Sequence, residues 1–184
     1  MRLCLWVLGA ALAAGLVRFA LARPAIEVRF PRTQQEPAGT HDLALFLYGP
    51  TLRVSSADFM RGHHPGYLLD GWDRPSLLEK WASDPSDRAP WAEVQLDRPR
   101  EIVEVAMELA GAHESAEFTQ RRYRIECWSG DRQILALPVE GNLDPRPRHA
   151  VACPASDRVR VSFALDSLPP DAVARVYELE VRGQ

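Results

Sequence analysis

Residues 63–105, HHPGYLLDGWDRPSLLEKWASDPSDRAPWAEVQLDRPREIVEV, are the stretch on which the interpretation of this chain depends. They place three tryptophans, two adjacent histidines and a Leu-Leu-Asp-Gly sequence in one segment. The Asp-Gly pair is typical of a tight turn, because aspartate hydrogen-bonds its own backbone and glycine accepts a positive φ. Alone, the segment fits three interpretations: a catalytic site, a sugar-binding surface, or the first turns of a β-sandwich.

The composition of the 184-residue chain is that of a globular protein. Hydrophobic residues make up 46% and charged residues 26%, which argues against a disordered chain. The formal net charge is −3, so no basic field exists to hold a nucleic-acid backbone, and we expect no nucleic-acid partner. Fifteen prolines against eleven glycines favour many stiff loops, as in an all-β domain.

From residue 41 onward, short strand-like runs alternate with turn signals. Polar and apolar residues interleave clearly in YRIECW and RVRVSF, which is the period of a half-buried strand. Eight such runs and almost no helical pattern predict an antiparallel β-sandwich. The runs are residues 51–56, 91–96, 101–111, 121–128, 133–139, 149–153, 158–165 and 175–183. Two segments stay ambiguous: residues 42–49 fit a strand or a helical turn, and residues 76–82 fit a short helix within a loop.

The N-terminus has the pattern of a targeting segment. Arg2 is followed by an apolar run over residues 3–17, and the stretch ends Ala-Leu-Ala at residues 20–22. This predicts a secretory signal peptide over residues 1–22. The alternative is an uncleaved signal anchor, an apolar helix formed by residues 3–22, which would be the protein's only attachment to a membrane. Residues 23–40 are expected to be a linker with one short strand at residues 26–30. Residues 41–184 are expected to form the domain, which would be periplasmic or secreted.

Export would change the expected redox state of the cysteines. Without the leader only Cys127 and Cys153 remain, and both lie in strand-like runs. In an oxidising compartment an even pair predicts a disulfide. The alternative is two buried free thiols.

A set of short motifs resembles the discoidin or coagulation factor 5/8 type C family, a branch of the galactose-binding-like sandwiches that includes many bacterial carbohydrate-binding modules. The matching pieces, in order, are Ser55-Ser56, Leu68-Leu69-Asp70-Gly71, Trp81-Ala82-Ser83, Trp91 with Val94 and Leu96, and Glu178 to Gly183. The resemblance covers about residues 40–184. It implies an all-β, jelly-roll antiparallel sandwich, in which we expect Trp81 and Trp91 to pack in the core.

The resemblance also implies a structural calcium ion. In that family the aspartate of the Asp-Gly pair and a last-strand glutamate often hold Ca²⁺, and these positions correspond to Asp70 and Glu178. Carboxylate and carbonyl oxygens suit this cation. The loop departs from the family, because a longer insert follows Gly71 and Glu79 stands where a Thr or Ser is usual. Glu79 either replaces the hydroxyl or marks a lost site. The alternative to a calcium site is that Asp70 caps a turn while Glu178 pairs with an arginine.

The family forms its sugar sites at the loop end of the sandwich. The polar and aromatic residues available there, and therefore the candidate ligand-binding set, are His63, His64, Tyr67, Trp72 and Arg74. A sugar site needs an aromatic face for stacking and a few fixed hydrogen-bond partners. Trp72, next to the turn, is the expected platform.

The sequence leaves two functions open, and they belong to different functional classes. The first is a non-catalytic glycan-binding domain; the alternative is a cell-envelope protein-interaction or assembly domain with no sugar ligand. We expect no enzyme, because the sequence has neither G-x-S-x-G nor H-E-x-x-H, and the two histidines beside the Asp-Gly pair give no triad order.

Overall fold

The computed structural model describes residues 24–72, 76–164 and 173–184. The expected signal or anchor helix over residues 1–22 lies outside these ranges. Within them, the secondary structure consists of strands and short 3₁₀ turns. No helix in the described part of the chain has the length and apolar character needed to cross a membrane.

The strands and 3₁₀ turns alternate along the chain as follows. The strands are β1 (Ile26–Arg29), β2 (His41–Asp42), β3 (Thr51–Val54), β4 (Trp81–Ala82), β5 (Trp91–Leu109), β6 (Tyr123–Ser129), β7 (Arg132–Val139), β8 (Arg148–Phe163) and β9 (Arg175–Gly183). The 3₁₀ turns are η1 (Phe46–Tyr48), η2 (Phe59–Arg61), η3 (Pro65–Leu69), η4 (Ala110–Ala112) and η5 (Ala116–Phe118).

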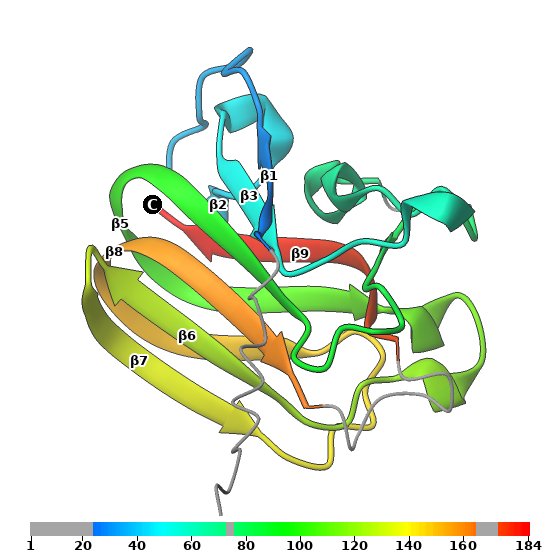
Figure 1. Cartoon of the computed structure of the whole chain (residues 1–184). Helices are drawn as coiled ribbons and strands as arrows, with labels where there is room; N and C mark the ends of the chain where they lie inside the picture. Colours follow the sequence, from blue (N-terminus) through cyan, green and yellow to red (C-terminus); the bar gives the residue numbers. More distant parts are fainter. Residues whose placement is uncertain (1–23, 73–75, 165–172) are drawn as a thin grey trace, which may run out of the picture.

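The strands form two layers of an antiparallel sandwich (Figure 1). The first layer has the order β1-β3-β5-β8-β6-β7 and uses the first part of β5 and the last part of β8. In the second layer the rest of β5 lies between the first part of β8 and β9, and β9 pairs on its other side with β2 and β4. The predicted all-β antiparallel sandwich is therefore confirmed.

Strands β5 and β8 each continue from one layer into the other. Figure 1 shows both of them turning at the same side of the molecule. The four expected runs in this part of the chain are thus two long bent strands. The β5–β8 register shifts between Gln95 and Arg100 and again near Ile102, as bulges do where a strand bends. Pro99 lies in the first shift, where its missing N–H removes no ladder hydrogen bond.

The core lies between the layers and contains Trp81, which is completely buried. Its indole Nε1 donates to the Ser56 carbonyl at 2.8 Å, and its ring lies 6.1 Å from that of Phe163. The expected core position is wrong for Trp91, which is only partly buried and lies beneath the Arg160 guanidinium, 4.2 Å from the ring centroid. Its neighbour Ala92 is buried, so strand alternation turns Trp91 outward.

Three local predictions are also settled. The short strand expected within the linker forms as β1, which pairs with β3 and so belongs to the sheet. Residues 42–49 form a helical turn, η1, after the end of β2. Residues 76–82 form a turn followed by β4, and no helix is present there.

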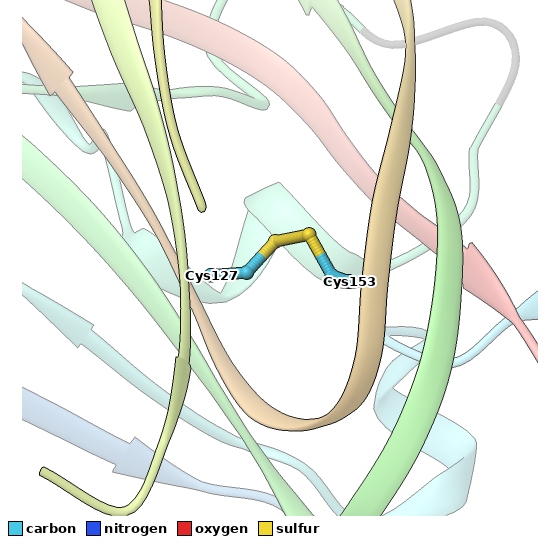
Figure 2. The surroundings of a disulfide bond; sticks show 2 residues. All are labelled: Cys127 and Cys153. Atoms are coloured by element: carbon cyan, nitrogen blue, oxygen red, sulfur yellow. A yellow bond between two sulfur atoms is a disulfide. The ribbon is translucent and has the colours of Figure 1, made fainter. Parts of the chain in front are cut away.

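The predicted disulfide is confirmed. Cys127 on β6 and Cys153 on β8 are bonded, with their Cα atoms 6.1 Å apart, and both are buried. Figure 2 shows the bridge crossing the space between β6 and the far limb of β8, above the bend of that strand. It therefore ties the two layers together. A bond of this kind is typical of an oxidising compartment.

Candidate functional site

The Asp-Gly turn after η3 is held from two sides. Gly71 has a φ of +71°, a backbone conformation that strains any residue with a side chain, and a Cβ here would also have to displace the Leu45 side chain, whose Cδ1 would lie 2.7 Å away. The Trp72 amide donates to Asp70 Oδ1 at 3.1 Å, and the Gly71 amide donates to Glu178 Oε2 at 3.2 Å. The turn therefore projects the Trp72 side chain from a fixed backbone, anchored to the last strand.

Trp72 lines the larger of two hollows at this turn. Its side chain is 64% exposed, which agrees with the surface position expected for it. The hollow, which we call the Trp72 groove, has a volume of about 500 Å³ and runs over the outer face of β5 and β9. It is lined by Asp42, Leu45, Gly71, Trp72, Ala106, Met107, Glu108, Arg146, Arg148, Glu178 and Glu180.

The wall of the Trp72 groove carries fixed charge pairs. Arg146 donates to Glu108 at 2.6 Å, and Arg148 donates to Glu104 at 2.8 Å while lying 3.6 Å from Glu180. Both arginines are more than half exposed, so these pairs face water. Such pairs contribute little to stability, but they place oriented donors and acceptors beside an exposed indole.

A buried lysine fixes residues 77–80, which precede β4. Lys80 Nζ donates to the Leu77 carbonyl at 2.6 Å, to Glu114 Oε1 at 2.8 Å and to the Tyr177 hydroxyl at 3.3 Å. The Tyr177 hydroxyl also donates to Glu114, at 3.0 Å. Because a buried ammonium group is costly unless it is fully hydrogen-bonded, this network sets where residues 77–80 lie.

The candidate ligand-binding residues do not all lie together. His63 is buried, with Nδ1 3.3 Å from the Leu78 carbonyl, so it is not available at the surface. His64 and Tyr67 line a second hollow, separate from the Trp72 groove. Arg74 lies outside the described residues. Of the four candidates that the structure describes, Trp72 alone lines the groove.

Asp70 and Glu178, the candidate calcium ligands, are side by side. Glu178 Oε2 accepts the Gly71 amide hydrogen, and Glu178 Oε1 is buried with no hydrogen-bond partner. Burial, together with the nearby Asp70 and Asp42 carboxylates, raises the pKa of Glu178 to about 10. Two carboxyl groups in this position must share either a proton or a cation, so the pair fits a hard divalent ion such as Ca²⁺.

The third candidate, Glu79, is engaged elsewhere. Its Oε2 accepts a hydrogen bond from the Ser76 amide at 2.7 Å. Within the described ranges, no group of three or more His, Cys, Asp or Glu side chains is arranged to hold a metal. A calcium ion at Asp70 and Glu178 would therefore need backbone carbonyls to complete its shell.

The residues that sequence reasoning missed are those of the groove wall. Glu108 belongs to β5, and about 40 positions later Arg146 lies just before β8 and Arg148 begins it. The register that brings these strands together, with Ala106 opposite Arg148, follows from the corner in both strands. No local motif signals it.

Neither a protein-family model nor a curated protein sequence matches the chain. Solved structures do. A family 32 carbohydrate-binding module from Streptococcus pneumoniae EndoD superimposes with a TM-score of 0.64 at 20% identity, covering 78% of this chain and all of the module. A fucose-binding module from S. pneumoniae gives 0.64 at 13% identity, covering 82% of this chain and all of that one.

This chain has the discoidin-like, galactose-binding-like fold. The resemblance noted in the sequence is confirmed at the level of the fold. The galactose-binding-like sandwich also occurs in an enzyme, the allantoicase from Saccharomyces cerevisiae, with a TM-score of 0.61 at 14% identity over 81% of this chain and 45% of that one. Most of the similar structures are binding modules, and identities this low establish the fold alone.

Proposed function

We propose that this chain is an exported, non-catalytic binding domain that holds a glycan in the Trp72 groove. The observation that carries the proposal is the exposed indole of Trp72 in a groove whose wall presents Glu108, Arg146, Arg148 and Glu180. The C–H face of a sugar ring stacks on an indole, while its hydroxyls accept hydrogen bonds from arginine and donate them to carboxylates. Two of the similar structures, a fucose-binding module and a carbohydrate-binding module, support this ligand class.

The test is a glycan array followed by titration calorimetry with the best ligand. Trp72→Ala should weaken binding at least about tenfold, because an aromatic stacking contact and its buried area are lost. Met60→Ala is the matched control, since Met60 is almost fully exposed and does not line the groove. Equal binding by both variants and the unchanged protein would contradict the proposal.

One observation favours the alternative, a protein-interaction domain of the cell envelope. Phe59, Met60, Leu77 and Leu78 are each more than half exposed, and the two segments that carry them meet where Asp58 N donates to Ala82 O and His63 Nδ1 approaches Leu78 O. Exposed apolar side chains gathered in this way are typical of a protein contact. An array with no glycan ligand, together with a crosslinked envelope protein that the Phe59→Ser, Leu78→Ser double variant no longer captures, would support this alternative.

Export of the domain rests on the apolar N-terminal pattern and on the disulfide, which is characteristic of oxidising compartments. Cell fractionation and mass spectrometry of the mature chain test this. Loss of residues 1–22 would indicate a cleaved signal, and an intact chain in the membrane fraction would indicate an anchor. Recovery of the intact chain in the cytoplasm would contradict export.

Calcium binding is proposed for Asp70 and Glu178, with a structural role. The unpartnered Glu178 oxygen supports it. Because Glu178 also accepts the Gly71 amide, a bound ion would fix the turn that projects Trp72. Loss of the ion should therefore weaken glycan binding as well as stability.

A further inference from the structure

A second hollow reaches the Asp70 turn and shares no lining residue with the Trp72 groove. It has a volume of about 420 Å³ and is lined by Phe30, Phe46, His64, Gly66, Tyr67 and Asp70. Four of these six residues are aromatic: Phe30 follows β1, Phe46 begins η1, and His64 and Tyr67 lie just before and within η3. We call it the aromatic hollow.

The rings of the aromatic hollow form two edge-to-face pairs. Phe30 and Phe46 have centroids 6.2 Å apart at 61°, and His64 and Tyr67 have centroids 6.3 Å apart at 81°. Gly66 lies between the pairs, where a Cβ would be 3.0 Å from His64 Nδ1 and 3.8 Å from Phe30 Cζ. The missing side chain at Gly66 therefore leaves room between the two pairs of rings.

The electrostatic character of the aromatic hollow is suited to a cation. None of its six lining residues is Lys or Arg, so no basic side chain of the lining opposes a cation there. His64 Nδ1 accepts the Gly66 amide hydrogen at 3.0 Å, which holds the ring in place beside Tyr67. Aromatic faces are negative and attract cations within about 6 Å of the ring centroid.

We propose that the aromatic hollow binds a quaternary ammonium group, such as the trimethylammonium end of a choline-bearing ligand. Several rings around an apolar cation form the arrangement that recognises this chemistry, because methyl groups pack against the rings while the charge meets their negative faces. A primary ammonium, which is strongly hydrated, would be disfavoured in a hollow that offers so few hydrogen-bond acceptors. The inference concerns a site separate from the Trp72 groove and does not depend on glycan binding there.

The test compares two ligands of the same shape by amide and aromatic NMR titration at about pH 8 and fixed calcium concentration. Choline carries the trimethylammonium group, and 3,3-dimethylbutan-1-ol replaces its nitrogen with carbon. Choline should shift the signals of residues 64–70 saturably and bind about tenfold more tightly than the alcohol. Tyr67→Leu and Phe46→Leu should each weaken choline about two- to fivefold, the loss expected for one ring. Met60→Ala is the control, since Met60 is exposed and lies outside the aromatic hollow.

Vesicles distinguish the sources of the group. Co-sedimentation with phosphatidylcholine vesicles but not with phosphatidylethanolamine vesicles would identify a lipid headgroup. Saturable binding of choline without vesicle binding would identify a small molecule or a substituent on a larger ligand. The proposal is overturned if the neutral alcohol binds as tightly as choline, if the choline shifts do not saturate, or if both leucine variants bind like the unchanged protein. Glycan binding by Tyr67→Leu should be unaltered, so a failure here is separable from a failure of the Trp72 groove.

Discussion

Removal of the Cys127–Cys153 bridge should lower the stability of the domain mainly through the unfolded state. The bonded cysteines are 26 positions apart. For a closed loop of that length the chain-entropy relation gives about 3.5 kcal/mol at 25 °C. The Cys127→Ala, Cys153→Ala double variant should therefore lose about that much free energy of unfolding, plus a smaller packing loss because both sulfur atoms are buried.

Guanidinium unfolding of the mature domain measures the effect and identifies its origin. Without the bridge the unfolded chain expands and exposes more surface, so the denaturant m-value should rise as the free energy falls. Val159→Ala is the control, because Val159 is buried and lies opposite Cys127 in the β6–β8 register. That variant should lose about 2 kcal/mol with no change in m, as a packing defect does.

Two results would refute this reasoning. One is a double variant that loses less than about 1 kcal/mol with an unchanged m-value, since the bridge would then add nothing to the constraint of the unfolded chain. The other is the detection of two reactive thiols per chain in the unfolded, unreduced mature protein, since the cysteines would then not be bonded.

Other predictions concern single side chains of the site and the core. Trp72→Ala should change the free energy of unfolding by less than about 0.5 kcal/mol, whereas Trp81→Ala should lower it by about 3–5 kcal/mol in the same denaturation assay; similar losses would mean that Trp72 is also a packing residue. A calcium chelator should lower the melting temperature and added Ca²⁺ should restore it, and Asp70→Ala should remove this response. Melting curves unaffected by either addition would mean that Asp70 stabilises the turn and binds no ion. Burial raises the pKa of Asp42 from 3.8 to about 6, so the folded state holds this proton more tightly, and stability should fall as the pH rises from about 4 to about 6. Asp42→Asn keeps an oxygen for the Ala44 and Val181 amides and should make that fall shallower in urea titrations across this range, leaving the part due to Glu178, whose pKa is also raised; an identical fall in the variant would assign all of it to other groups.

The sequence was sufficient for the fold where the evidence is local or compositional. Period-2 alternation located the strands, and the two cysteines of the domain left a single intramolecular pairing. The corners of β5 and β8 were missed because Asp97, Pro99 and Pro154 are ordinary loop residues, and whether a chain bends within a strand or leaves it depends on the partner strand. The outward direction of the Trp91 side chain, by contrast, follows from strand alternation, because Ala92 and Val94 point to the other face and are both buried.

The candidate site was only partly predictable. Trp72, Asp70 and Glu178 are predictable from short motifs. An Asp-Gly pair indicates the turn that carries Asp70 and Trp72, and the motif that begins at Glu178 indicates the last strand. His63 has the chemistry of a ligand contact, but burial against the Leu78 backbone removes it from the surface. Phe30 and Phe46, which complete the aromatic hollow, resemble any core residue in sequence. Their role depends on the empty space at Gly66, which is set by three distant segments.

The passage of β5 and β8 through both layers has a consequence for how the domain folds. Neither layer can form while the other is absent, because each would lose its central strands. Pairs such as Ile102 with Gly183 join positions some eighty residues apart, so the entropy of closing long loops must be overcome before most of the hydrogen bonds exist. We therefore expect a single cooperative transition and a folding time in the millisecond-to-second range of high-contact-order β proteins. The cysteines of the newly made chain would still be reduced when this slow folding step begins. Maturation of the domain therefore depends on whether the disulfide forms before or after the strands pair.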